Sequence, residues 1–468
     1  MNTRPAALFQ GEIPHRRTLR IAGALSAVCF TALAMGAHSE VIEIRSGVRA
    51  ASLSCPPGIA PKKQPPRPLP PVELAPPEPE ILTDLSLDAS PVMPVDPVVI
   101  NPGLPPAFSI AIWGDSHAAA RFLSDGLVAS MGYGEDDVRP SFIPAAIGIA
   151  GVRLPVRQSC ADKGWTYQQA NAVRNGRMPF ARGLVTMSTS TAGSYLWVDF
   201  GLGQPGQELA SLGLVFRPGA SEDRAILAAS VDDGPERIII MDDHPDGFVT
   251  LLPDRPMRML KLRVLAGAVA FEGFEPHYLV PGRLTVDTFG IPGARFRSWR
   301  AVDETYLRDR SASRGYDLVL LEYGTNEGSD ASFDAGAYEV ELRAGLEAFR
   351  TVYPDAACVL VGPTDRGVLV KRTRQGHRVG AKVASADLLK YARVHQVIGS
   401  VQQRVGSAFG CGFWNWQDAM GGPGGAYRWF HAKPGLMARD LIHLNPAGYR
   451  VSAGKLALYL GRTYPELR

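Results

Sequence analysis

The chain has 468 residues, of which 46% are hydrophobic and 20% charged, as in an ordinary globular protein. Its formal net charge is +3, and part of that excess comes from arginines close to the N-terminus, namely Arg4, Arg16, Arg17 and Arg20. The rest of the chain is therefore close to neutral and has no basic stripe of the kind that nucleic-acid binding requires, so we expect no nucleic-acid partner.

The N-terminal segment, residues 1–39, is typical of an export signal. A basic stretch ends at Arg20, an apolar run follows over residues 21–36, and small residues lie near its end, where a signal peptidase cuts. The run is shorter than the roughly 20 residues of a spanning helix. We predict a signal peptide, with a retained N-terminal membrane anchor as the alternative. The expected location is the periplasm or cell envelope.

Residues 40–106 are predicted to form a proline-rich linker. Seventeen of the 38 prolines fall between Pro56 and Pro106. Proline removes backbone donors and breaks helices, so this density favours an extended chain over a packed core.

An α/β pattern begins at Phe108. The apolar run 108–113 predicts a strand, Gly114-Asp-Ser116 a tight turn, and residues 117–131 a helix. From about Phe180 to Val286 the character changes to short strands separated by Gly, Pro and Asp turns, which predicts a β-sandwich. The expected strands of this region are 183–187, 195–200, 212–216, 225–231, 238–241 and 259–264.

The α/β pattern resumes after residue 285. Buried strands are predicted at 318–323, 358–362 and 411–416, and helices at 338–352, 384–405 and 446–460. Alternating strands and helices imply a parallel sheet with helices on both faces. The expected fold is therefore an α/β domain, residues 107–150 and 285–468, interrupted by an inserted β-sandwich, residues 151–284.

Ser116 is the candidate nucleophile. It lies where a strand turns into a helix, which places its hydroxyl at the carboxyl edge of the sheet, where open α/β sheets bind ligands. The alternative role is a helix cap. His443 is the candidate base, since Asp440 lies three residues before it and a turn with that spacing lets the carboxylate hold one ring nitrogen.

Asn326 and Gly293 are the candidate oxyanion donors. Asn326 follows a buried strand, where its amide can donate to an oxyanion or stabilise a turn. Gly293 offers a backbone N–H in a turn. His117 starts a helix and is expected to point away from the serine's face, while Glu322 and Glu327 give no reason to be paired as a glycosidase dyad.

The order of these signals along the chain resembles the SGNH (GDSL-like) hydrolase family. Its blocks correspond to Gly114-Asp-Ser116, the Gly293 turn, Gly324-x-Asn326 and Asp440-x-x-His443. The resemblance implies a flavodoxin-like sheet, catalysis by Ser116, His443 and Asp440, and an oxyanion hole formed by Ser116, Gly293 and Asn326. The family usually carries Asn before the glycine turn where this chain has Asp287, so Gly290 is an alternative to Gly293.

A narrower resemblance is to bacterial peptidoglycan O-acetylesterases, through Gly-Asp-Ser-His, Tyr-Gly-Thr-Asn-Glu and a carbohydrate-module-like β region between these blocks. It implies a serine esterase that removes O-acetyl groups from a cell-envelope glycan, with no cofactor and no metal. The alternatives are an O-acetyltransferase with the same residues, and a non-catalytic glycan-binding protein. We also expect both connections of the inserted region to emerge at the carboxyl edge of the sheet, so that the sandwich positions a glycan over Ser116.

Four cysteines remain outside the predicted signal: Cys55, Cys160, Cys358 and Cys411. They allow three disulfide connectivities in an oxidising compartment. Buried free thiols are the alternative.

Overall fold

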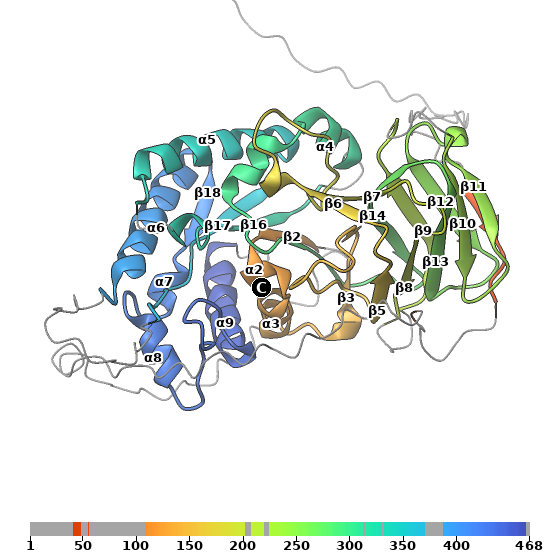
Figure 1. Cartoon of the computed structure of the whole chain (residues 1–468). Helices are drawn as coiled ribbons and strands as arrows, with labels where there is room; N and C mark the ends of the chain where they lie inside the picture. Colours follow the sequence, from red (N-terminus) through yellow and green to blue (C-terminus); the bar gives the residue numbers. More distant parts are fainter. Residues whose placement is uncertain are drawn as a thin grey trace, which may run out of the picture. The chain divides into compact units, whose positions relative to one another are not determined.

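A six-stranded parallel sheet lies at the centre of the α/β part of the molecule (Figure 1). Its strand order is β18-β17-β16-β2-β15-β3. Leaving out the short edge strand β3, this is the 2-1-3-4-5 order of flavodoxin-like sheets, as expected. The strands are β2 (Phe108–Gly114), β3 (Val138–Arg139), β15 (Leu284–Gly290), β16 (Leu318–Glu322), β17 (Ala357–Val361) and β18 (Cys411–Trp414).

The computed structural model describes residues 41–47, 55, 108–201, 207–219, 224–311, 315–329, 332–369 and 387–464. The predicted signal, residues 1–39, and most of the predicted linker lie outside the described residues. Among the helices of the described part, none is long and apolar enough to cross a membrane.

Helices cover both faces of the parallel sheet. Successive residues of each strand point to opposite sides, so each strand contributes side chains to both of these interfaces. In β2, Ala111 and Trp113 pack into a core that includes residues of α5, whereas Ile110 and Ile112 pack against α3 and α9. The α-helices are α2 (Ser116–Ala119), α3 (Phe122–Ser130), α4 (Glu304–Ser311), α5 (Ala335–Val352), α6 (Lys390–Ala408), α7 (Trp416–Ala419), α8 (Gly425–His431) and α9 (Pro446–Thr463).

The helix expected at 117–131 is divided in two. Arg121 has a φ of 62°, in the left-handed region, and separates α2 from α3. The nucleophile block therefore opens on a helix of a single turn. Further single turns of 3-10 helix are η1 (Glu135–Asp137), η2 (Ala170–Ala172), η3 (Met241–Asp243) and η5 (Glu327–Ser329), and a longer one is η4 (Phe296–Ala301).

The inserted region is a β-sandwich, as expected. One sheet has the order β1-β12-β9-β14-β7-β6, with β4 also paired to β14, and the other has the order β11-β10-β13-β8-β5. A hydrophobic core with Leu214 and Phe271 from the first sheet and Val198 and Leu262 from the second fills the space between them. The strands are β1 (Val41–Ile44), β4 (Ile143–Pro144), β5 (Gln158–Ala161), β6 (Thr166–Gln169), β7 (Val185–Thr189), β8 (Tyr195–Asp199), β9 (Leu209–Phe216), β10 (Ile226–Val231), β11 (Arg237–Ile240), β12 (Phe248–Pro253), β13 (Met259–Ala266) and β14 (Val269–Tyr278).

Two segments outside the expected insertion belong to the sandwich. β1, which falls inside the predicted linker, pairs in parallel with β12. Three of the four residues in its sequence Val-Ile-Glu-Ile are β-branched, which favours a strand, and the segment precedes the prolines. β4 pairs with β14, so the chain passes from the parallel sheet to the sandwich between Arg139 and Ile143, some residues before the expected boundary at 151.

The sandwich and the parallel sheet share one hydrophobic core. Phe142 and Phe180, from the sandwich side, pack in the same cluster as Trp113 and Phe289. Asp287, fully buried in β15, accepts hydrogen bonds from the Ser141 N–H and hydroxyl, the Phe142 N–H and the Tyr316 hydroxyl, at 2.7, 2.6, 3.1 and 2.6 Å. The sandwich is therefore not a separable module.

The two connections of the insertion meet different edges of the parallel sheet. On the way in, the chain passes the carboxyl edge, where the Arg153 N–H donates to the Ala119 carbonyl at 2.9 Å. On the way out it enters β15 at Leu284, which pairs with Phe108, the first residue of β2. The expectation that both connections emerge at the carboxyl edge was wrong, because a strand parallel to β2 must be entered from the amino edge.

Two disulfides are formed among the described residues, Cys55–Cys160 and Cys358–Cys411. The second joins two residues that face each other in register on β17 and β18. The first ties residue 55 to β5 of the sandwich. These pairings select one of the three connectivities that the sequence left open.

Candidate active site

Ser116 lies at the carboxyl end of β2, as the first residue of α2. Asp115 caps this helix, because its Oδ1 accepts a hydrogen bond from the His117 N–H at 2.9 Å. The capping role that the sequence left open for Ser116 thus falls to Asp115. The Ser116 hydroxyl is therefore not used for capping, and Figure 1 shows the short helix α2 beside β2.

His443 and Asp440 complete a hydrogen-bonded chain with Ser116. Ser116 Oγ lies 2.9 Å from His443 Nε2, and His443 Nδ1 lies 2.6 Å from Asp440 Oδ2. Asp440 Oδ1 accepts from the backbone N–H groups of Ile442 and His443, each at 2.9 Å. The carboxylate is therefore fixed by its own turn. Ser116 and His443 are separated by 327 positions in the sequence and are brought together only by the fold.

The charges in this chain favour an ionised aspartate and a basic imidazole. Partial burial raises the pKa of Asp440, but the hydrogen bonds from His443 and from the two backbone N–H groups outweigh it and bring the pKa to about 2. The hydrogen bond to Asp440 is the largest influence on His443 and raises its pKa, against the effect of partial burial. A base of this kind accepts a proton from a serine hydroxyl more readily.

Asn326 connects the nucleophile turn to the glycine turn. Its Nδ2 donates to Asp115 Oδ2 at 3.1 Å and to the Ala294 carbonyl at 2.9 Å. Because the amide has two hydrogens, both are donated to protein acceptors in this structure. Donation to a substrate oxygen would replace or share one of these bonds.

Gly293 occupies the tight turn that follows β15. Its φ of 80° lies in the left-handed region that favours glycine, and the Ala294 N–H donates to the Ile291 carbonyl across the turn at 2.9 Å. Among the described residues, no acceptor is found for the Gly293 N–H. Gly290, the alternative, lies within β15, where a Cβ would come within 2.1 Å of the Ala119 nitrogen. Close packing against α2 is thus sufficient reason for a glycine at position 290.

Three acidic residues are buried at the nucleophile turn: Asp115 within the turn, and Glu322 and Glu327 from the β16 end. Burial raises the pKa of Asp115 to about 6 and that of Glu327 to about 7. Burial, together with the charge of Asp115, raises the pKa of Glu322 well above its ordinary value. Glu322 Oε2 accepts from the Asp115 N–H at 3.2 Å. Sequence reasoning did not assign this supporting role to Glu322, although a glutamate at the end of an apolar buried strand was the available signal.

His117 points into the core behind the base. It is fully buried, its Nδ1 lies 2.9 Å from the Tyr449 hydroxyl, and its ring centroid lies 5.2 Å from that of His443. Burial lowers the pKa of His117 to about 3. It therefore stays neutral and places no second positive charge beside His443.

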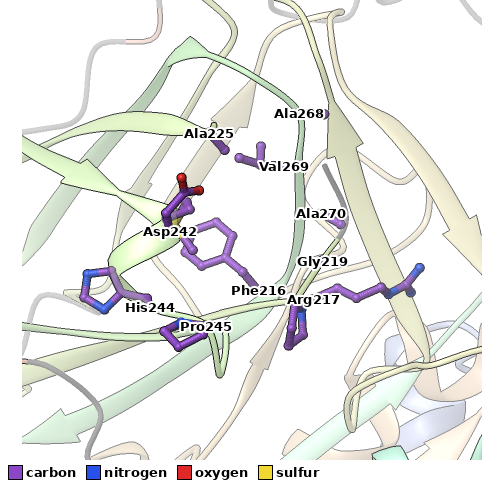
Figure 2. Close-up of a pocket in the computed structure, with 13 residues that line it drawn as sticks. Phe216, Arg217, Gly219, Ala225, Asp242, His244, Pro245, Ala268, Val269 and Ala270 are labelled. Atoms are coloured by element: carbon purple, nitrogen blue, oxygen red, sulfur yellow. The ribbon is translucent and has the colours of Figure 1, made fainter. Parts of the chain in front are cut away.

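A separate cavity of about 240 Å³ lies within the sandwich (Figure 2). Phe216, Asp242, His244 and Val269 are among its lining residues, and none of the four residues Ser116, Asn326, Asp440 and His443 is. The Arg217 guanidinium points away from the cavity and donates to Gln168 and Thr186. In the described part of the chain, no group of three or more His, Cys, Asp or Glu side chains is placed to hold a metal ion.

A flavodoxin-like sheet with a serine, histidine and aspartate aligned at its carboxyl edge defines a serine-type hydrolase. Residues 271–451 match the model of the GDSL-like Lipase/Acylhydrolase family. The chain therefore carries a GDSL-like acylhydrolase domain and is a carboxylic ester hydrolase. The match includes Gly293, Asn326, Asp440 and His443 but not Ser116, which precedes the inserted strands.

The fold is similar to that of a solved peptidoglycan O-acetylesterase, with 22% sequence identity, a TM-score of 0.52, and coverage of 76% of this chain and 91% of that chain. Family two carbohydrate esterases from Cellvibrio japonicus and Clostridium thermocellum, the latter in complex with cellohexaose, are each 12% identical, with TM-scores of 0.27 and 0.28. They cover 66% and 65% of this chain and 99% and 100% of their own chains. No curated protein sequence matches the chain.

Proposed function

We propose that the protein is an exported serine esterase that removes O-acetyl groups from a cell-envelope glycan, most specifically peptidoglycan, through an acetyl-enzyme on Ser116. The observation that carries the proposal is the continuous hydrogen-bonded chain from Ser116 Oγ through His443 to Asp440. A serine hydroxyl needs such a base and orienting group to become a nucleophile.

In the first half-reaction, Ser116 Oγ attacks the acetyl carbonyl while its proton passes to His443 Nε2. Asp440 accepts the Nδ1–H bond throughout and stabilises the imidazolium without taking the proton. Collapse of the tetrahedral intermediate breaks the bond to the sugar oxygen, which leaves with the proton from Nε2. Water then attacks acetyl-Ser116 with His443 as base, releasing acetate and restoring the Ser116 hydroxyl.

The negative charge on the carbonyl oxygen would be stabilised by the N–H groups of Ser116 and Gly293 and by the Asn326 amide. The Ser116 N–H belongs to the first turn of α2, whose amides have no intrahelical acceptor. Asn326 is held against both the nucleophile turn and the residue after Gly293. The Asn326 side chain therefore connects the two turns that supply the other two donors, the N–H groups of Ser116 and Gly293.

Two observations support the substrate class and the export. A solved protein with a similar fold is a peptidoglycan O-acetylesterase, and the likeness covers 91% of that chain. Disulfides such as Cys55–Cys160 and Cys358–Cys411 persist in oxidising compartments. An apolar signal followed by a disulfide-bonded enzyme suits the periplasm or the cell envelope, with or without a retained membrane anchor.

We also propose that the sandwich helps to hold the glycan. Tyr195 and Trp197 are partly exposed neighbours on one face of β8, with ring centroids 5.2 Å apart, and aromatic rings are surfaces on which sugars stack. Because the sandwich shares its core with the hydrolase part, deleting it would not leave a folded enzyme. Substitution of Trp197 by alanine is the suitable test, with loss of activity on polymer but not on p-nitrophenyl acetate as the expected result.

The decisive experiment measures acetate release from O-acetylated peptidoglycan, beside O-acetylated xylan and alginate. Wild type should release acetate fastest from peptidoglycan, and Ser116→Ala should abolish release while retaining the wild-type melting temperature, since a small residue at a turn contributes little to stability. Ser400→Ala, on the exposed face of α6, is the matched control and should behave as wild type.

Other outcomes would point to the alternative activities. Acetylated product that forms only when a glycan acceptor is added would instead establish an O-acetyltransferase. Absence of any Ser116-dependent turnover, with p-nitrophenyl acetate included, would leave a glycan-binding protein.

A further inference from the structure

Arg366 lies in the loop that follows β17, at the carboxyl edge of the parallel sheet. This loop is hydrogen-bonded to the turn that carries the base. The Thr364 hydroxyl donates to the Ile442 carbonyl at 3.5 Å, and the Gly367 N–H donates to the Leu441 carbonyl at 2.9 Å. Arg366 is therefore anchored on both sides against the segment between Asp440 and His443.

The guanidinium of Arg366 reaches the turn that carries Asn326. Its Nη1 donates to the Ser329 hydroxyl at 2.9 Å, and the Ser329 N–H in turn donates to the Asn326 carbonyl at 3.4 Å. The guanidinium also lies over the Tyr391 ring, 4.4 Å from its centroid. The guanidinium is thus held against the turn that carries Asn326, and it lies close enough to the base for its charge to act against the raised pKa of His443.

Within the part of the chain that the structure describes, this charge has no carboxylate partner. Among the described residues, no acidic side chain lies within ion-pair distance of Arg366, and its Nε is buried without an acceptor. Asp440 influences the guanidinium electrostatically, but its two oxygens are occupied by His443 and by backbone N–H groups. The Arg366 side chain is partly buried, so its charge is only partly solvated, and a ligand anion would stabilise it further.

The sequence that follows Arg366 is also positively charged. After Arg366 come five further cations, and no acidic residue appears before Asp387. The five cations are Lys371, Arg372, Arg374, Arg378 and Lys382. This run of charge is read from the sequence alone, and the proposed site consists of Arg366 only.

We infer that Arg366 binds a carboxylate of the substrate, and that the preferred substrates are O-acetyl esters of carboxylate-bearing sugars. A guanidinium presents paired donors that match a carboxylate, so it would fix the sugar ring relative to Ser116. The inference deepens the proposed function and rests on it for the identity of the reacting ester. A uronate and a sugar with a carboxylate-bearing ether, such as muramic acid, share this chemistry.

The first test compares each acidic substrate with its methyl ester, which differs only in the charge. Wild type should cleave 6-O-acetylmuramic acid or an O-acetylated uronate with a kcat/KM roughly 10- to 100-fold above that of the methyl ester, the range expected for one hydrogen bond to a charged group. Arg366→Gln should reduce this ratio to about 1, and Arg366→Lys should retain part of it. Comparison of the two acids shows which source of carboxylate is preferred.

Arg462→Gln is the matched control. Arg462 is exposed and lies 16 residues after Pro446 on α9, about 24 Å along the helix. For Arg462→Gln, the ratio of kcat/KM for the acid to kcat/KM for its methyl ester should equal that of wild type. A wild-type ratio near 1, or a ratio unchanged by Arg366→Gln, would overturn the inference while leaving the esterase assignment in place.

A second measurement does not depend on the natural ester. Galacturonate oligomers and their methyl esters are compared as competitive inhibitors of p-nitrophenyl acetate hydrolysis. The acid should inhibit wild type at least tenfold more strongly than the methyl ester, and Arg366→Gln should lose that difference. Equal inhibition by acid and methyl ester would refute carboxylate binding. Failure of the O-acetyl sugars as substrates, with this inhibition intact, would refute only the proposed function.

Discussion

Substitution of Asp440 by asparagine changes one atom at the end of the proposed catalytic hydrogen-bond chain. In the protein, Asp440 Oδ1 accepts from two backbone N–H groups and Oδ2 accepts from His443 Nδ1. An asparagine must keep its carbonyl oxygen toward the two N–H donors, because its NH₂ group cannot accept from them. The NH₂ group then faces His443 Nδ1 and requires a lone pair there.

The resulting histidine tautomer is the wrong one for catalysis. With Nδ1 as an acceptor, the proton of the neutral ring moves to Nε2, which lies 2.9 Å from Ser116 Oγ. Nε2 is then a donor and cannot accept the serine proton. In a serine protease the equivalent change lowers kcat by about 10⁴-fold. The Asp440 side chain here is 42% exposed, so water can replace part of its effect. We therefore expect a decrease of roughly 10³- to 10⁴-fold in kcat, or about 4–5.5 kcal/mol.

The assay is p-nitrophenyl acetate hydrolysis between pH 5 and 9, with KM and kcat determined separately. His443 must be neutral to act as a base, and its pKa is raised above the ordinary value of about 6.5 chiefly by the hydrogen bond to Asp440. Wild-type activity should therefore decrease as the pH falls through that raised pKa. In Asp440→Asn the remaining activity should have its acid limb at lower pH, with KM nearly unchanged.

Asp125→Asn is a matched control, because Asp125 is 43% exposed and pairs with Arg121 on the surface. It should leave kcat and the pH profile unchanged. A fall of less than tenfold in kcat for folded Asp440→Asn, or a flat wild-type profile between pH 5 and 8, would refute the roles given to Asp440 and His443.

Three further predictions concern Asn326 as an oxyanion donor, the Cys358–Cys411 disulfide, and the contact of Asp287 between the parallel sheet and the sandwich. Asn326→Ala should lower kcat by roughly 10²- to 10³-fold with little change in KM, and a loss below fivefold would remove Asn326 from the oxyanion hole. Replacing Cys358 and Cys411 together by alanine should lower the free energy of unfolding, measured in urea, by about 2–4 kcal/mol, because the bridge closes a loop of 53 residues; an unchanged midpoint would contradict this. Asp287→Ala should cost about 3–5 kcal/mol and unfold both parts in one transition, since it leaves four buried hydrogen-bond donors without an acceptor; separate transitions would show that the sandwich is independent.

Local sequence was sufficient to predict the central elements and their order. Strands of a parallel sheet are apolar on both faces, so runs such as Leu318–Glu322 stand out without any knowledge of their partners. The residue at the end of each such run lies at the carboxyl edge, which is why Ser116 and Asn326 were found as candidates. The β character of the insertion was equally visible, because short strands and turn residues have a local signature.

Contacts between distant segments could not be predicted in this way. β1 was assigned to the linker because its partner, β12, lies some 200 residues later in the chain. The four cysteines fit three pairings until register placed Cys358 opposite Cys411. Likewise, no local feature of Asp287 shows that it anchors the sandwich to the sheet.

The sequence by itself thus determined the class of fold and the residue types of the site, because periodicity and turn chemistry are local properties of the chain. The tertiary structure alone decided that Ser116 meets His443 at 2.9 Å, that Glu322 lies beneath Asp115, and that the Arg366 guanidinium reaches Ser329 in the turn that carries Asn326. Each of these contacts joins side chains that follow different strands and meet at one edge of the sheet. Their distances and burial are set only when the strands align in the folded sheet, so the sequence of a single segment does not contain them.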